Sequence, residues 1–174
     1  MTDRLSPPQR HICMSHIHSK NTKPELKVRK WLWGHGYHYR LNVKGVPGKP
    51  DIVMRRYRTA IFVNGCFWHG HEGCDKFKMP KTNVEFWEAK ISRNQERDKQ
   101  NYQILQDNGW QVLVLWECQL SKKLFETTMQ EVEVMLHSYY LATIGHNHKV
   151  KDYIRIDEDD IPMAAEAEEE YGIF

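Results

Sequence analysis

Residues 51–63 read DIVMRRYRTAIFV, two apolar segments that flank a short basic turn. β-Branched and aromatic side chains favour extended backbone, so this pattern predicts two consecutive β-strands joined by the turn. A third apolar run, WQVLVLW, occupies residues 110–116 and is almost unbroken. Such a run is typical of a central strand that is covered on both faces. These three segments are therefore the expected strands of a β-sheet.

Helical patterns surround these strands. A capping-box sequence, TKPE, opens a helix predicted over residues 22–34, because Thr and Glu at this spacing satisfy free N–H groups of the first turn. Apolar residues at helical intervals predict two more helices, over residues 83–108 and 124–140, and a further strand is expected over residues 37–43. The order α-β-β-β-α-β-α predicts an α/β fold with a mixed central sheet flanked by helices.

The charge is distributed unevenly along the 174 residues. Residues 1–120 carry 20 Lys and Arg against 11 Asp and Glu, whereas residues 121–174 carry 5 against 12. A basic body favours a polyanionic partner such as nucleic acid, and the alternative is a solvated surface that is basic by chance. We expect a flexible arm at residues 1–13, a domain at residues 14–143 and an acidic tail at residues 144–174.

Several protein classes are excluded by composition. The 40% hydrophobic and 28% charged content suits a globular chain rather than a disordered one. No apolar run is long enough to span a bilayer, and the first residues lack the apolar segment of a secretory signal, so a cytoplasmic, nucleoid-associated location is expected. Four cysteines in that compartment point to metal ligands or free thiols rather than to disulfides.

A dense cluster of metal-binding residue types occupies the loop at residues 64–80. Cys66, His71 and Cys74 lie within nine residues, and Cys118 follows the third predicted strand. Zinc favours tetrahedral thiolate and imidazole ligands, and four protein ligands leave no position for substrate, so such a site is structural. Two alternatives stay open: the cysteines are buried apolar residues, or His69 replaces His71 as the ligand.

Four sequence motifs are more specific to a protein family than these patterns: PGKPDIV at 47–53, IFVNGCFWHGH at 61–71, EFW at 85–87 and GWQVLVLWEC at 109–118. Together they resemble the very short patch repair (Vsr) mismatch endonuclease family over residues 14–120. The resemblance implies a restriction-endonuclease-like fold and a magnesium-dependent enzyme that nicks DNA 5′ of the thymine in T:G mismatches, which arise when 5-methylcytosine deaminates. It also implies that the structural zinc ligands are Cys66, His71, Cys74 and Cys118.

The same resemblance assigns the catalytic centre. Asp51 is implied as the principal magnesium ligand and the backbone carbonyl of Val63 as the second, which agrees with the preference of Mg²⁺ for oxygen ligands. Without the family, an Asp after Gly-Lys-Pro is more often a turn residue. His69 matches the catalytic histidine, a plausible general acid or base near neutral pH.

Three further polar residues have competing interpretations. The resemblance places Glu25 and Asp98 near the water shell of the metal, whereas the local sequence predicts that Glu25 completes the capping box and that Asp98 is a solvent-facing helix charge. Asn64 departs from the family pattern, because related enzymes carry a histidine there. An amide donates hydrogen bonds to phosphate but cannot carry the charge of a proton, so an altered rate or pH dependence is expected.

Aromatic side chains are the expected mismatch readers. The resemblance assigns Phe67, Trp68 and Trp87 to intercalation from one groove and Met14 to the opposite side, and the alternative for the aromatic residues is core packing. Insertion between base steps is less costly at a weakened, mismatched step, which favours mismatched DNA. The candidate phosphate contacts are Lys20, Lys23, Lys49, Arg93 and Arg97.

The expected partner is double-stranded DNA with a T:G mismatch, bound by a monomer that uses catalytic Mg²⁺ and structural Zn²⁺. Mismatch-repair proteins are a further candidate partner, and the acidic tail either docks one, shields the basic groove or has no role. Two alternative functions remain: a zinc-stabilised DNA-binding module without nuclease activity, and a nuclease of the same fold with broader specificity.

Overall fold

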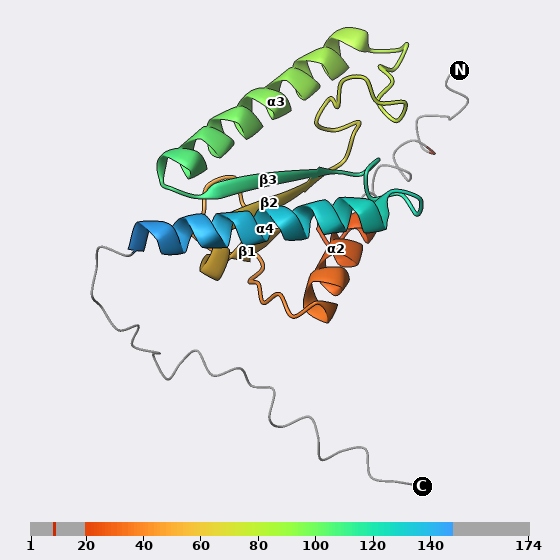
Figure 1. Cartoon of the computed structure of the whole chain (residues 1–174). Helices are drawn as coiled ribbons and strands as arrows, with labels where there is room; N and C mark the ends of the chain where they lie inside the picture. The colour runs from red at the N-terminus through yellow and green to blue at the C-terminus, as the bar shows by residue number, and fades with distance from the viewer. Residues whose placement is uncertain (1–8, 10–19, 148–174) are drawn as a thin grey trace, which may run out of the picture.

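The computed structural model of the chain describes residue 9 and residues 20–147 (Figure 1). Met14, most of the predicted arm and the chain after residue 147 lie outside the described residues. The described elements follow the order α2 (Lys23–Gly34), β1 (Ile52–Met54), the 3₁₀ turn η1 (Arg55–Tyr57), β2 (Thr59–Asn64), α3 (Val84–Asp107), β3 (Gln111–Trp116) and α4 (Phe125–Asn147). In this part of the chain no helix is long and apolar enough to cross a membrane.

The predicted mixed sheet is confirmed. Its strand order is β1-β2-β3, with β1 antiparallel to β2 and β2 parallel to β3. The prediction that residues 110–116 form the central strand is wrong, because β2 is central and β3 is an edge of the described sheet. Strand β3 is apolar because helices pack on both of its faces. A strand at the edge of a sheet can be covered in this way as well as a central one.

The predicted strand at residues 37–43 is also wrong. Arg40 forms one isolated antiparallel bridge with Val53 and no continuous ladder. Two local features explain this. The hydroxyl of Tyr37 donates a hydrogen bond to Glu133 of α4 at 2.9 Å, which fixes the start of the segment against that helix. Asn42 then adopts a left-handed backbone with φ 50°, which bends the chain away from the sheet.

The predicted start of α2 is confirmed. Thr22 is the N-cap, and its hydroxyl accepts the backbone N–H of Glu25 at 3.4 Å, while Pro24 occupies the first turn. The inner face of α2 buries Val28 and Leu32 completely. The last helix begins near its predicted start but continues to Asn147, well beyond the predicted end at residue 140.

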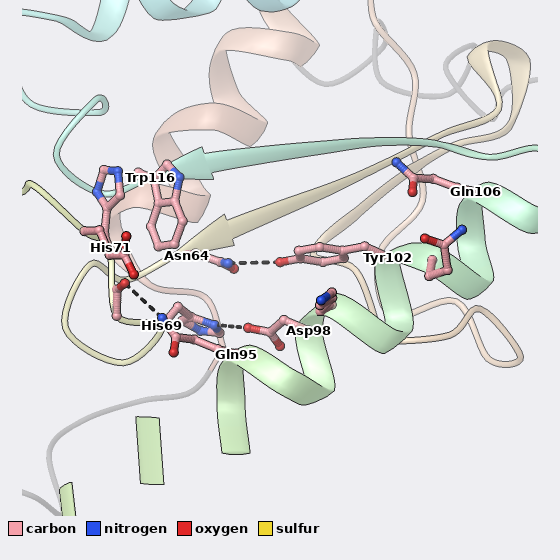
Figure 2. A pocket seen from close by; sticks show the side chains of 12 residues that line it. Asn64, His69, His71, Gln95, Asp98, Tyr102, Gln106 and Trp116 are labelled. Atoms are coloured by element: carbon pink, nitrogen blue, oxygen red, sulfur yellow. Dashed lines mark hydrogen bonds and ion pairs between the residues drawn. The ribbon is translucent and has the colours of Figure 1, made fainter. Parts of the chain in front are cut away.

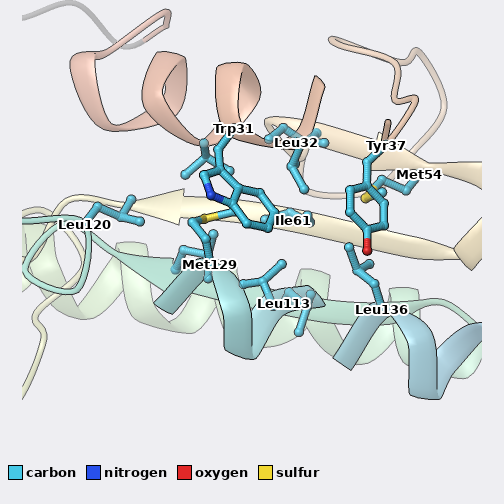
Figure 3. Packing of buried hydrophobic residues seen from close by; sticks show 13 residues of the cluster. Trp31, Leu32, Tyr37, Met54, Ile61, Leu113, Leu120, Met129 and Leu136 are labelled. Carbon is cyan, nitrogen blue, oxygen red and sulfur yellow. The ribbon is translucent and has the colours of Figure 1, made fainter. Parts of the chain in front are cut away.

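The core lies on both faces of the sheet, and the side chains of β2 alternate between the two. Ile61 packs with α2 and α4, and Figure 3 shows it between Trp31 and Leu113. Phe62 points to the opposite face and packs against Leu105 of α3. Burial of each such side chain contributes roughly 1.5–3 kcal/mol to the free energy of unfolding. The packed sheet therefore fixes the positions of the residues at the ends of its strands.

Candidate active site and metal centre

A cleft of about 950 Å³ opens where β1 begins and β2 ends, and residues of α2 and α3 line its two walls. Three predicted carboxylates, Glu25, Asp51 and Asp98, line it together with His69 and Asn64. Of the predicted phosphate contacts, Lys49 and Arg97 also line the cleft, joined by Lys90, which the sequence reasoning missed. The exposed side chains of Lys20, Lys23 and Arg93 are not among the lining residues.

Asp51 is held at the edge of the sheet by β2. The backbone N–H of Val63 donates a hydrogen bond to Asp51 Oδ2 at 2.8 Å. In a strand, the N–H and C=O of one residue point to the same side, so the Val63 carbonyl faces the Asp51 side as well. Burial raises the pKa of Asp51 to about 6 although the Val63 hydrogen bond lowers it, and the charge of Glu25 raises it further. A bound cation would relieve this penalty.

Glu25 is 3% exposed, and its carboxylate bonds to residues at the start of α2. Its Oε1 accepts the Thr22 hydroxyl at 2.8 Å, and its Oε2 accepts the Asn21 N–H and Arg29 Nη2, each at 2.9 Å. A carboxylate offers about four lone-pair positions, so these three bonds leave one position on Oε1. The capping interactions and one hydrogen bond from a water molecule therefore fit on the same group.

Arg29 is a residue of the site that the sequence reasoning missed. It is 8% exposed, and besides its ion pair with Glu25 its Nη1 donates to Asn21 Oδ1 at 2.6 Å. Its positive charge also lowers the pKa of Asp51, which opposes the effects of burial and of Glu25. The signal in the sequence was its position four residues after Glu25, because side chains at i and i+4 of a helix lie on the same face and can form an ion pair.

His69 and Asp98 form a tight hydrogen-bonded pair between the loop and α3 (Figure 2). Burial alone would raise the pKa of Asp98, but the hydrogen bond and charge of His69, together with Arg97, lower it below its ordinary value. Asp98 is therefore an acceptor, and the His69 proton resides on Nδ1, which leaves Nε2 for a substrate. The interpretation of Asp98 as a solvent-facing charge is wrong, since its side chain is 16% exposed.

Asn64, at the end of β2, is 5% exposed and donates its amide N–H to the Tyr102 hydroxyl at 3.0 Å. Burial raises the pKa of Tyr102 to about 12, so this phenol stays protonated. Figure 2 shows the Asn64–Tyr102 contact beside the His69–Asp98 pair, in a side pocket of about 490 Å³. The amide is thus bound to the scaffold in a fixed orientation.

The predicted metal ligands converge from the loop after β2, which carries Cys66, His71 and Cys74, and from the segment after β3, which carries Cys118. The ligand atoms of Cys66, His71, Cys74 and Cys118 all lie within 4.8 Å of one another. His71 Nδ1 lies 3.4 Å from Cys118 Sγ, and its ring stacks on Trp116 at 4.1 Å between centroids. Burial raises the pKa of Cys66 to about 12, so its thiolate requires a nearby cation. Three sulfurs and one imidazole suit a tetrahedral metal such as zinc.

This convergence bears on the two alternatives for the cysteines and for His69. The cysteines gather at one point with free thiols, which separate buried apolar residues would not do. The ring of His69 contacts Asp98, and of the two histidines it is His71 that lies with the three thiols, in a cluster that could hold a metal ion.

The predicted wedge residues form one aromatic cluster. Phe67 lies 5.2 Å between ring centroids from both Trp68 and Trp87, and Trp68 lies 5.9 Å from Trp87. All three are partly exposed, so they are not ordinary core residues. The sequence reasoning missed Phe86, which packs on Trp87 at 5.3 Å and is 55% exposed. Its position next to Trp87 in the motif EFW could have identified it.

Helix α3, which carries Phe86 and Trp87, also fixes the loop that carries Phe67 and Trp68. Asn94 Nδ2 donates to the carbonyl of Trp68 at 2.8 Å, and Gln95 Nε2 donates to that of Gly70 at 3.1 Å. Gly70 has φ 58°, and a Cβ atom there would lie 2.7 Å from Ile91 Cγ2. Only glycine permits this close approach of loop and helix.

The family described as "DNA mismatch endonuclease Vsr" matches residues 2–76. The chain is 49% identical to the type II nicking enzyme V.NmeAIP of Neisseria meningitidis, over 71% of this chain and 87% of that protein. It is 48% identical to the type II nicking enzyme V.XorIIP of Xanthomonas oryzae, over 70% and 88%. It is 44% identical to the DNA mismatch endonuclease Vsr of Escherichia coli, over 62% and 68%.

Proposed function

The chain belongs to the Vsr family of DNA mismatch endonucleases and acts on DNA, and we propose that it nicks one strand 5′ of the thymine in a T:G mismatch with Mg²⁺ as cofactor. The observation that carries this proposal lies at the edge of the sheet where β1 begins and β2 ends. There the Asp51 carboxylate and the Val63 backbone meet in a cleft that His69 also lines. A sheet with these catalytic groups at its strand ends supports the restriction-endonuclease-like fold that the resemblance implies.

Two oxygen donors fit a magnesium site. The Asp51 carboxylate and the Val63 carbonyl would hold Mg²⁺, and the remaining positions suit water, which Mg²⁺ gives up reluctantly. The bound ion would activate a water molecule and stabilise charge on the phosphate. The free lone pair of Glu25 Oε1 is available to orient one water molecule of this shell.

His69 supplies proton transfer in this proposal. Asp98 holds the imidazole by Nδ1, so Nε2 faces the substrate in a fixed tautomer. Asn64 is tied to Tyr102 and cannot carry a proton, so it serves as a fixed neutral group next to the scissile phosphate. One histidine, His69, then handles the proton chemistry.

The aromatic cluster is the proposed mismatch reader. Phe67 and Trp68 are partly exposed on the loop after β2, which contacts with α3 and the Cys66–His71–Cys74–Cys118 cluster hold in place, and the partly exposed Trp87 lies in the first turn of α3. A rigid wedge loses little conformational freedom on insertion, and unstacking costs least at a mismatched step. Structural zinc, held by the thiol–imidazole centre, is proposed to keep this loop in place.

The proposed endonuclease domain spans residues 14–143 and acts as a monomer, with the arm at 1–13 and the acidic tail at 144–174 outside it. Mismatch-repair proteins remain a proposed partner.

The test uses a fluorescent duplex with one T:G pair, a T:A duplex of the same sequence, and reactions with Mg²⁺ or EDTA. The proposal predicts one nick, 5′ of the mismatched thymine, that requires both the mismatch and Mg²⁺. Equal cutting of the T:A duplex would instead indicate a nuclease of broader specificity. Nicking in EDTA would contradict the magnesium site.

A further inference from the structure

Beyond the cleft, the outer face of α2 and the loop after it form a basic surface. We define this α2 surface by its seven exposed basic side chains: Lys20, Lys23, Lys27, Lys30, Arg40, Lys44 and Lys49. The sequence between residues 20 and 50 contains one acidic residue, Glu25, which is buried against Arg29. From α4, Glu126 contributes one acidic neighbour through a hydrogen bond from Trp31 at 3.5 Å. The surface therefore has a strong excess of positive charge.

The lysines of α2 follow a regular line. Lys23, Lys27 and Lys30 share one helix face, because residues three or four positions apart are neighbours on it. At a rise of about 1.5 Å per residue, this line is about 10 Å long. One DNA strand presents a phosphate about every 3.4 Å along the duplex axis, so the line spans about three phosphates. The spacing suits a nucleic-acid backbone.

The basic residues of the α2 surface extend from the cleft to the loop that follows α2. Thr22 and Lys49 line the cleft, so the α2 surface begins there. At the other end, Trp33 is 62% exposed and packs its ring edge against His38 at 5.3 Å between centroids, which joins the helix to the following loop. A cleft of about 950 Å³ holds only a few nucleotides, so a bound duplex must continue over its rims. The α2 surface forms one such rim.

We propose that the α2 surface binds the phosphate backbone of the duplex that flanks the mismatch, several base pairs from the nick. This inference rests on the proposed function, because it takes a duplex in the cleft as its starting point. Lysine–phosphate contacts add affinity without sequence readout, and they make that affinity depend on salt. An acidic polypeptide would also suit the charge, but the regular lysine line that begins at the cleft favours the substrate itself.

The test compares two double variants with the same charge change. Lys30→Glu with Lys44→Glu reverses two charges of the α2 surface, and Arg55→Glu with Arg56→Glu is the control. These control residues are exposed on η1, at the end of β1 that lies away from Asp51. Two T:G substrates are used: a 24-bp duplex and a 10-bp duplex closed at both ends by loops. Fluorescence anisotropy measures affinity between 50 and 200 mM salt.

The α2 variant is expected to bind the 24-bp duplex at least about tenfold more weakly at 50 mM salt. Its slope of log affinity against log salt should decrease by about 2, since each lost phosphate contact contributes about 0.9. Binding of the 10-bp duplex and of both substrates by the control variant should stay within about twofold of the unchanged protein.

Three results would overturn the inference: an unchanged salt slope, an equal loss on both duplexes, or an equal loss in the control variant. Normal binding of the 24-bp duplex combined with lost binding of polyglutamate would assign the surface to an acidic polypeptide and would also overturn it. Nicking is measured in parallel. If the unchanged protein nicks no T:G substrate, the proposed function fails, whereas the comparison of duplex lengths still decides the binding surface.

Discussion

Asp51→Asn is expected to stabilise the fold while it abolishes hydrolysis. In the folded protein the pKa of Asp51 is raised from 3.8 to about 6, chiefly by burial. Each pKa unit corresponds to about 1.4 kcal/mol, so the charged carboxylate costs up to about 3 kcal/mol at neutral pH without a cation. Asparagine removes the charge, and its carbonyl can still accept the Val63 N–H. We therefore expect the free energy of unfolding at pH 7.5 to rise by about 1–3 kcal/mol.

The pH dependence of this gain follows from linkage. Because the raised pKa belongs to the folded state, the unchanged protein takes up a proton at Asp51 and gains stability as the pH falls through about 6. The advantage of the variant is thus full above pH 6 and is lost by about pH 4. Urea unfolding in EDTA-free buffer without divalent ions, followed by tryptophan fluorescence, measures both quantities. A variant that is less stable at pH 7.5, or whose difference in stability from the unchanged protein does not change with pH, would show that the charge of buried Asp51 does not destabilise the fold.

Three further predictions concern separate parts of the site. His69→Gln should lower the single-turnover nicking rate by about 10²–10⁴ while metal analysis still finds the thiol-bound metal; a rate within threefold would remove the proton-transfer role. Cys118→Ser should lower the bound zinc below one equivalent and make the loop after β2 sensitive to protease, and full zinc retention would contradict the four-ligand centre. Trp68→Ala should reduce the preference for T:G over T:A duplexes at least tenfold in nicking assays, and an unchanged preference would exclude it as a mismatch reader.

Local sequence signals predicted the helices well because their causes are local. The cap formed by Thr22 and the buried face of α2 depend on residues within one or two turns, and both are present in the structure. The segment at residues 37–43 failed for the opposite reason. Its alternation resembles a strand, but contact of Tyr37 with the distant Glu133 and the left-handed backbone of Asn42 decide its path. Neither feature is visible in a short window of sequence.

The candidate site shows the same division. The sequence spacing alone groups Cys66, His71 and Cys74. The register of β2 and β3 explains why Cys118 also reaches this group, because Asn64 pairs with Trp116. Asp98 looked like a surface charge because its neighbours on α3 are polar, yet the loop folds back and places His69 against it. Arg29 was overlooked because pairing at i and i+4 is common on exposed helices, and its burial is a tertiary property.

The proposed function assigns Asp51 to hydrolysis rather than to DNA recognition. Its most direct test is single-turnover nicking of a T:G duplex by Asp51→Asn in Mg²⁺, at protein concentrations where anisotropy shows that both proteins saturate the DNA. The expected result is an affinity for the duplex within about threefold of that of the unchanged protein and no detectable nick. A nick formed at the normal rate by the fully bound variant would contradict it.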